Sequence, residues 1–421
     1  MRKRRIQKRV NINPNAKEFN SLNEPNKKIN RKLPPVKRRI RKSVVAHNPP
    51  PPPPKSQKPK NPHPNKKYTI THALYENNEN FSNSIPLKSL RKIFFNNLQT
   101  YCISKFNEAK TTGKPIVNMV FHGHWGWVFS KMIQKYKKYN NKFEIISSVY
   151  PIPGAAVYQY WRPVSDLGLE MLKNISDANH PYWSKGVHMM HDSPFDKNRA
   201  KAEVRILTLG KIKNALCTSK EQQQYFDGKI GNTKFWYTPL GINENLIPRE
   251  KINLDNKIKI GFIGRLYWDK VKGEDLLIKI AEKLDPNKFE FVILSPNADK
   301  LISVLKRKFT VYTNNSGSFE NLFSSIDVTL ILSKYEGTPL PLIESLKLGI
   351  HVLSTRVGEV PTVLGKKYIL SSADEFVKGL NEVYENRDLL QTVKEKGPEI
   401  VKDRTWKLFV EKSMKIWESI L

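Results

Sequence analysis

The residues best suited to chemistry are two glutamates, Glu336 and Glu344, in the segment 332–364. The preceding run Val328–Leu332 is predominantly apolar, as in a parallel strand buried on both faces. It places Glu336 in the turn at the carboxyl end of that strand, where open α/β sheets bind their ligands. Taken alone, two glutamates at this spacing also fit a solvated turn and a helix surface with salt bridges.

A helix is predicted directly after this turn. Thr338 followed by Pro339 is typical of an N-cap and a first-turn proline, and Gly349 ends the apolar stripe that follows. The free backbone N–H groups of the first helical turn favour an anion in the same crevice. Glu344 lies one to two turns into the helix, so its carboxylate can reach hydroxyl groups deeper in the cleft.

A second turn, earlier in the chain, has the character of a phosphate-binding site. A strand ends at Gly264, and Arg265 and Lys272 follow before a predicted amphipathic helix, Glu274–Leu284. A guanidinium suits bidentate contact with phosphate, and a lysine acts as a point charge. Lys270 is an alternative to Lys272 for this contact.

The two segments together resemble the donor half of retaining GT-B glycosyltransferases, the glycosyltransferase family four group. The resemblance rests on GRLYWDKVKGEDLLIKIAEKL at 264–284 and EGTPLPLIESLKLGIHVLSTRVGEVPTVL at 336–364. Glu336 and Glu344 match the family's Glu-x7-Glu motif, which implies that Glu336 faces the transferred sugar and Glu344 bonds the nucleotide ribose. The residues that it implies for the donor diphosphate are Gly264, Arg265, Lys272, Gly337 and Thr338.

Other segments carry the resemblance over roughly residues 115–421. Ala215–Ser219 resembles the family's strand that ends in serine, and Trp236–Asn243 resembles its turn into the interdomain linker. Arg404–Phe409 resembles the start of a helix that crosses back to the first domain. One departure concerns the late glycine-proline turn, where Thr362 replaces the usual glutamate and Glu359 stands nearby.

The acceptor side is expected in the first domain. Val187–Asp192 resembles the strand end that carries an active-site histidine, so His191 is the predicted catalytic histidine; a satisfied strand-end histidine is the alternative. His122, His124 and Arg162 are candidates for acceptor contacts. Arg162 lies in the aromatic segment Pro151–Pro163, which is interpreted as a loop that either positions an acceptor or packs between domains.

The whole chain alternates strand-like apolar runs with helical patterns, which favours parallel sheets. Residues 68–421 are too many for one simple core. The predicted fold class is α/β of the GT-B type, with two Rossmann-like domains facing a central cleft. The predicted divisions are a tail at 1–67, a first domain at 68–245, a donor domain at 246–403 and a returning helix at 404–421.

Residues 1–67 differ in kind from the rest. They hold 21 Lys and Arg against two Glu, so they contribute +19 to the net charge of +33, and they include Pro49–Pro54. No apolar periodicity could bury a core, which predicts a disordered tail with a polyproline II portion. An anionic membrane surface and nucleic acid are its candidate partners; a solubilising tail without a specific partner is the alternative.

Composition limits the cellular setting and the chemistry. No run of roughly 18 apolar residues predicts a membrane span, and the basic N-terminus lacks the apolar core of a secretory signal. Two cysteines, Cys102 and Cys217, suggest reduced thiols. The prediction is a cytoplasmic protein, with a peripheral position at a membrane as an alternative. No Asp-x-Asp pair occurs, so no metal is expected, and the nucleotide-sugar is a co-substrate rather than a cofactor.

The predicted function is transfer of a sugar from a nucleotide-sugar donor to an unidentified acceptor, which could be a glycan, a lipid or a protein. The resemblance implies retention of the anomeric configuration. One alternative is a nucleic-acid-modifying glycosyltransferase that uses the basic tail to bind DNA. Another is a non-catalytic binding protein that kept the GT-B fold.

Overall fold

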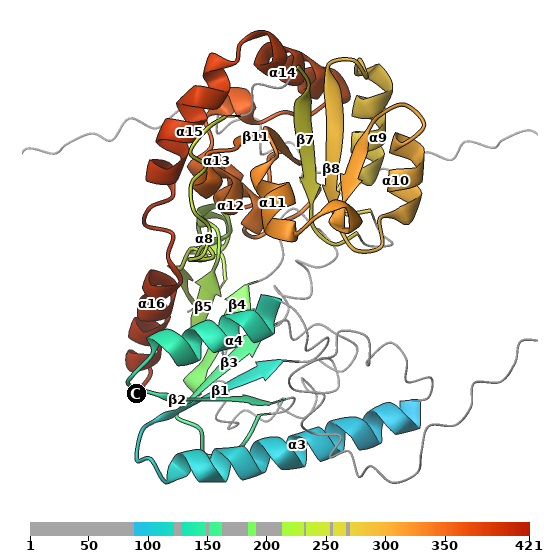
Figure 1. Cartoon of the computed structure of the whole chain (residues 1–421). Helices are drawn as coiled ribbons and strands as arrows, with labels where there is room; N and C mark the ends of the chain where they lie inside the picture. The colour runs from blue at the N-terminus through green and yellow to red at the C-terminus, as the bar shows by residue number, and fades with distance from the viewer. Residues whose placement is uncertain are drawn as a thin grey trace, which may run out of the picture. The chain divides into compact units, whose positions relative to one another are not determined.

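The computed structural model describes residues 88–121, 128–148, 151–161, 184–190, 213–230, 233–252, 256–266 and 270–421. These residues form two parallel sheets, each covered by helices (Figure 1). The first domain contains the sheet β1–β6 and the second contains the sheet β7–β11. The predicted two-domain α/β architecture is therefore confirmed.

The first sheet has the order β2-β1-β3-β4-β5-β6. Helix α3 covers one face and helix α4 covers the other, as Figure 1 shows. Alternate residues of β3 point to opposite faces, since Tyr158 and Tyr160 pack with α3 while Val157 and Trp161 pack with α4. The elements of this domain are α3 (Lys88–Lys110), β1 (Ile116–Phe121), α4 (Val128–Tyr139), β2 (Glu144–Ser148), β3 (Val157–Trp161), β4 (Gly186–Met190), β5 (Asn214–Cys217), α8 (Lys220–Phe226) and β6 (Lys234–Tyr237).

Strand β3 corrects the interpretation of Pro151–Pro163 as an aromatic loop. Val157–Trp161 is a fully buried strand that pairs with β1 and β4. The run VYQYW holds a β-branched residue and three aromatic residues, which are common in strands. Gln159, at its centre, interrupts the continuous apolar run that is expected of a strand buried on both faces, so the sequence pattern did not reveal the strand.

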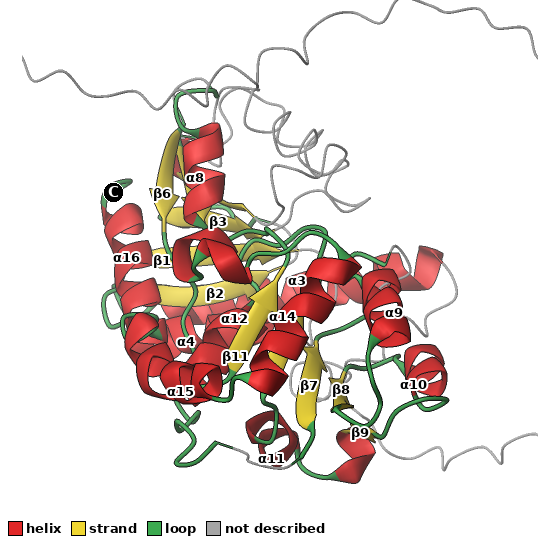
Figure 2. Ribbon diagram, turned by 90° about the horizontal axis from the view of Figure 1, so that it is seen from above, coloured by secondary structure: helices red, strands yellow, loops and turns green. Residues whose placement is uncertain are grey.

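The second sheet has the order β11-β10-β7-β8-β9. Figure 2 shows α9 and α10 on one side of β7 and β8, while α11 and α12 pack on the opposite face. Its elements are β7 (Ile258–Ile263), α9 (Glu274–Lys283), β8 (Phe289–Leu294), α10 (Asp299–Leu305), β9 (Val311–Thr313), η2 (Asn314–Ser316), α11 (Phe319–Ser324), β10 (Val328–Ile331), α12 (Leu340–Leu348), β11 (His351–Ser354), α13 (Val360–Val363), η3 (Lys366–Tyr368), α14 (Ala373–Glu385) and α15 (Asp388–Ile400).

The last helix, α16 (Trp406–Glu418), returns to the first domain and packs beside α4. The chain crosses between the domains where Gly241 meets residues 405 and 406, and a Cβ at Gly241 would lie 2.3 Å from the backbone nitrogen of Trp406. A buried polar chain anchors the helix. Trp417 Nε1 donates to Gln159 Oε1 at 2.8 Å, and Gln159 Nε2 donates to the Tyr136 hydroxyl at 3.2 Å.

Among the described residues, no helix combines the length and apolar character that a membrane span requires.

Candidate active site

The candidate site lies at the carboxyl ends of β7 and β10. From β7 the chain runs to β8 and β9 on one side of the sheet, then returns to β10 on the other side of β7. The two neighbouring strands are thus followed by loops that leave in opposite directions. A crevice opens between such loops, and it is where open α/β sheets bind ligands.

The two turns at this crevice bring Lys272 and Glu336 into contact. The Lys272 ammonium donates a hydrogen bond to Glu336 Oε1, and the Ser333 hydroxyl donates to the same oxygen at 2.9 Å. Lys272 also lies over Gly264, since a Cβ at that glycine would be 3.9 Å from Lys272 Nζ. Three residues predicted from two separate turns therefore lie together, and the side chains of Lys272 and Glu336 each keep less than a fifth of their surface exposed.

Gly273 is the residue that allows this contact. It has φ +83°, and a Cβ there would lie 2.1 Å from the carbonyl oxygen of Leu332, at the end of β10. The Lys334 N–H donates to the Val271 carbonyl oxygen at 2.8 Å, which joins the same two turns. Any larger residue at position 273 would push the lysine turn away from the glutamate turn.

Lys270, the alternative to Lys272, takes a different position. Its ammonium pairs with Asp275 at 2.8 Å, and both side chains are more than half exposed. Within the described part of the chain, the ion pair of Glu336 is with Lys272 and not with Lys270. Arg265 is half-buried directly after β7, beside Gly264.

Thr338 does not cap α12, so that prediction is wrong. The N-cap is Pro339, the helix begins at Leu340, and no side chain caps it. The Thr338 hydroxyl instead donates to the carbonyl oxygen of Thr218, at the end of β5 in the first domain, at 2.6 Å. The Thr338 hydroxyl thus bonds a group 120 residues away in the sequence and not the N–H groups of its own helix. A local sequence pattern cannot reveal such a partner. Gly349, by contrast, ends the helix with φ +73° as predicted.

Glu344 lies on α12, one turn beyond the start of the helix, and is half-buried. Burial raises its pKa to about 7, while the positive charge of Lys131 on α4 opposes that rise. Among the described residues no group donates a hydrogen bond to this carboxylate, so it can accept hydrogen bonds from the hydroxyl groups of a ligand.

Glu359 is a residue whose role the sequence did not reveal. Its side chain is fully buried in the turn after β11, and its carboxylate accepts from the Tyr237 hydroxyl and from the Lys220 N–H, at 2.9 Å for the latter. Arg404 pairs with it at 2.6 Å. The only signal in the sequence was a glutamate displaced from its usual place in the late turn.

Several predicted site residues lie outside the described residues: His122, His124, Arg162 and His191. The donor-side residues can be placed, and the acceptor-side predictions stay predictions.

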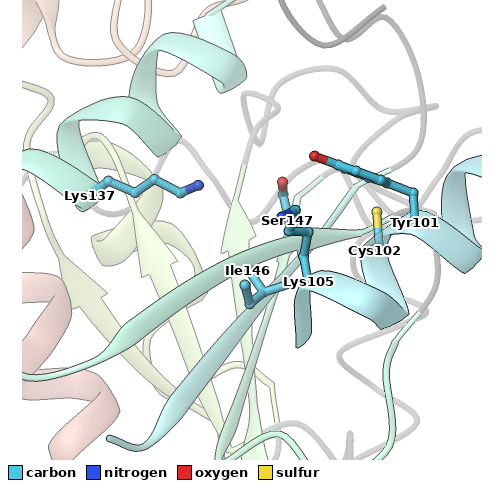
Figure 3. A pocket seen from close by; sticks show the side chains of 6 residues that line it. All are labelled: Tyr101, Cys102, Lys105, Lys137, Ile146 and Ser147. Carbon is cyan, nitrogen blue, oxygen red and sulfur yellow. The ribbon is translucent and has the colours of Figure 1, made fainter. Parts of the chain in front are cut away.

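Within the described ranges, no three His, Cys, Asp or Glu side chains gather in a way that could hold a metal ion. A hollow of about 220 Å³ lies in the first domain, where Figure 3 shows Tyr101, Cys102 and Lys105 of α3 facing Ser147 of β2 and Lys137 of α4. None of the predicted site residues lines it.

Comparison with protein families gives a match over residues 257–386 to the family described as "Glycosyl transferases group 1". The matched segment contains both turns of the crevice, with Gly264, Lys272 and Glu336.

A curated relative is similar over part of the same region. It is the Klebsiella pneumoniae protein named "Uncharacterized 41.2 kDa protein in cps region", which is 29% identical over 124 residues. The match covers 29% of this chain and 32% of the relative, so the chain spans about a third of that protein's length.

Solved structures share the fold at low identity. Sucrose-phosphate synthase from Thermosynechococcus elongatus has a TM-score of 0.57 at 13% identity, covering 73% of this chain and 99% of its own. HepE from Anabaena, solved with UDP-glucose, has a TM-score of 0.56 at 12% identity, covering 73% and 100%. A mutant of S. aureus TarM in complex with fondaparinux, alpha-GlcNAc-glycerol and UDP has a TM-score of 0.50 at 16% identity, covering 62% and 55%. The two parallel-sheet α/β domains of this chain therefore resemble the GT-B fold.

Proposed function

We propose that this protein transfers a sugar from a UDP-sugar to an acceptor, with retention of configuration and without a metal ion or further cofactor. The observation that carries the proposal is the contact of Lys272 with Glu336 over Gly264, at the β7/β10 crevice within the segment that matches the group 1 family. The choice of uridine is supported by HepE and TarM, which share the fold and were solved with UDP or UDP-glucose.

In the proposed mechanism, the donor diphosphate lies at Gly264, where glycine lets a phosphate approach the backbone closely. Lys272 exchanges its pairing with Glu336 for the diphosphate, and Arg265 supplies a second cation. These charges stabilise the negative charge that develops on the leaving diphosphate. Glu336, released from Lys272 but still bonded to Ser333, faces the sugar as positive charge develops at its anomeric carbon.

Glu344 is proposed to accept hydrogen bonds from the ribose hydroxyls. A half-buried carboxylate can accept two charge-assisted hydrogen bonds from the vicinal hydroxyl groups of a ribose. The same position offers little to a donor without vicinal hydroxyls, so Glu344 would select ribonucleotide over deoxyribonucleotide sugars.

The first test is thermal stabilisation of the protein by UDP-, GDP-, ADP- and TDP-sugars. A ligand at about 100 times its Kd stabilises the native state by roughly 2.7 kcal/mol, which is easily measured. We expect the UDP-sugars to stabilise it most. The Glu336→Gln variant should bind the donor and lose transfer or donor hydrolysis, and normal turnover by that variant would remove Glu336 from the mechanism.

A matched pair of variants tests the diphosphate site. Lys272→Met should weaken UDP-sugar binding by at least about tenfold, because a charge-assisted contact to phosphate is lost. Lys270→Met removes a neighbouring lysine of the same turn that pairs with exposed Asp275, and we expect its affinity to stay near that of the wild type. The opposite order of effects would assign the phosphate to Lys270.

A further inference from the structure

The turn after β11 makes direct contact with the turn that carries Glu336. Gly358 has φ +46°, and a Cβ there would lie 1.8 Å from the carbonyl oxygen of Gly337. The Glu359 N–H donates to this same carbonyl oxygen at 3.0 Å. No side chain separates the two turns at this point, so a displacement of either backbone is passed directly to the other.

The side chain of Glu359 leaves the second domain and contacts three groups outside its sheet. Its carboxylate accepts from the Lys220 N–H at the start of α8, from the Tyr237 hydroxyl of β6, and from Arg404 at 2.6 Å. The carboxylate is completely buried, and the Arg404 side chain keeps 13% of its surface exposed. A charge so deeply buried is stable only while these partners stay in place.

The charges around this network agree with a firm attachment. The Lys220 N–H is one of the free donors of the first turn of α8, where a carboxylate is favoured. Burial is the larger cause that raises the pKa of Tyr237, and the negative charge of Glu359 is the second. The phenol therefore stays protonated and donates a hydrogen bond to the carboxylate. All three partners therefore act as donors to a single acceptor group.

The space beside this network is not closely packed. An open cleft of about 530 Å³ lies between the exposed face of α8 and the turn after β11, lined by Glu221, Tyr225, Arg356 and Thr362 among others. The pair across it, Arg356 and Glu221, is 3.3 Å apart, and Arg356 is largely exposed. Because Arg356 is largely exposed, this pair contributes less to the attachment of α8 to this turn than the buried Glu359 network does.

We propose that Glu359 is a positioning residue that fixes the first domain relative to the donor-binding turn at Gly337. It does so through its buried carboxylate on one side and its backbone N–H on the other, without touching a substrate. An effect of Glu359 on the rate of sugar transfer rests on the proposed function, whereas its effect on the position of the first domain does not. Thr362, at the place where the family has its late glutamate, lines the open cleft rather than this network.

The first test measures domain position directly. Cysteines introduced at Asp227, beyond α8, and at Lys378 on α14 are both exposed and can carry spin labels, while native Cys102 and Cys217 are buried. Glu359→Gln keeps the size of the side chain and removes its charge, so Arg404 loses its ionic partner. We expect a broader distance distribution in this variant, and an unaltered one after Glu385→Gln, an exposed control on α14.

The ion pair of Glu359 with Arg404 provides a second variant, whose effect on the distance distribution a general loss of stability would not produce. Adding Arg404→Gln to Glu359→Gln removes the unpaired cation, so the distance distribution should narrow again. If Glu359→Gln leaves the distribution as narrow as in the wild type, the proposal is overturned. A broadening equal to the sum of both single variants would also overturn it, because coupled residues are not additive.

The catalytic readout separates this proposal from the proposed function. For Glu359→Gln we expect the Kd of the UDP-sugar to change by no more than about twofold, because the substitution alters only the side chain and keeps the backbone N–H that bonds the Gly337 carbonyl oxygen. Its kcat should fall by roughly 100-fold, because reacting groups on two domains are no longer held in register. Wild-type protein that binds no UDP-sugar would refute the function, and the spin-label distances would still decide the role of Glu359.

Discussion

The substitution Glu344→Gln should make the protein more stable at pH 8 and a weaker binder of UDP-sugars. The pKa of Glu344 is raised from 4.5 to about 7, chiefly by burial. A carboxyl whose pKa is higher in the folded state contributes stability that is complete below the unfolded pKa. That contribution is lost as the pH rises from about 4.5 through about 7, because the buried group must then carry a charge.

The magnitude follows from the size of the pKa shift. A rise of this size corresponds to a loss of roughly 3 kcal/mol in the free energy of unfolding between low and high pH. Glutamine has nearly the same shape and no charge to bury. The stability of the variant relative to the wild type should therefore increase by up to about 3 kcal/mol between pH 4.5 and pH 8.

Urea denaturation at a series of pH values measures this difference. Glu385→Gln, an exposed substitution of the same kind on α14, is the control and should show a difference that hardly changes with pH. If the Glu344→Gln difference is the same at pH 4.5 and pH 8, the carboxylate is not desolvated in the folded protein and the reasoning is refuted.

The same shift predicts the pH dependence of donor binding. If the ionised carboxylate accepts the ribose hydroxyls, the wild-type affinity for UDP-glucose should rise by up to about tenfold from pH 6 to pH 8, as the group ionises. UDP-glucose has no phosphate that titrates in this range, so the change would belong to the protein. Calorimetric titration of Glu344→Gln should give a weaker affinity without this rise; an equal rise in the variant would assign it to another group.

Three further predictions concern stability. Gly273→Ala should lower the free energy of unfolding by about 2–4 kcal/mol, since φ is +83° and the new Cβ would meet the Leu332 carbonyl oxygen at 2.1 Å; unchanged denaturation would contradict this. Trp417→Phe should cost about 1–3 kcal/mol in the same assay, because the buried amide oxygen of Gln159 loses its donor at 2.8 Å, and a smaller cost would mean that water replaces the indole. Burial lowers the pKa of His351 to about 4, so stability should fall by up to roughly 3 kcal/mol as the pH drops from 6.5 to 4; His351→Phe should remove that loss, and a variant with the same acid sensitivity would exclude His351 as its source.

The sequence predicted most strands because they are buried on both faces. The strands β1, β7 and β8 are continuous or nearly continuous apolar runs, which is the pattern of parallel strands. The strand Val157–Trp161 escaped prediction because Gln159 is polar. Its amide is satisfied by Trp417 and Tyr136, and both partners are distant in the sequence.

The candidate site shows the same division. Glycine, cation and carboxylate motifs identified Gly264, Lys272 and Glu336, because residue type and position after a strand are properties of the local sequence. That Lys272 rather than Lys270 lies beside Glu336 depends on the contact of Gly273 with Leu332, and therefore on two strands being neighbours. Thr338 could not be assigned locally, since its partner is the carbonyl oxygen of Thr218.

By itself, the sequence determined the fold class, and it predicted the two turns of the candidate donor site within the segment that matches the group 1 family. These follow from apolar periodicity and from short motifs, both of which are read over a few neighbouring residues. Only the tertiary structure decided that Glu359 joins two domains and that Glu344 has a pKa near neutrality. Burial and long-range partners cause both effects, because the cost of desolvating a charge depends on what the folded chain places around it.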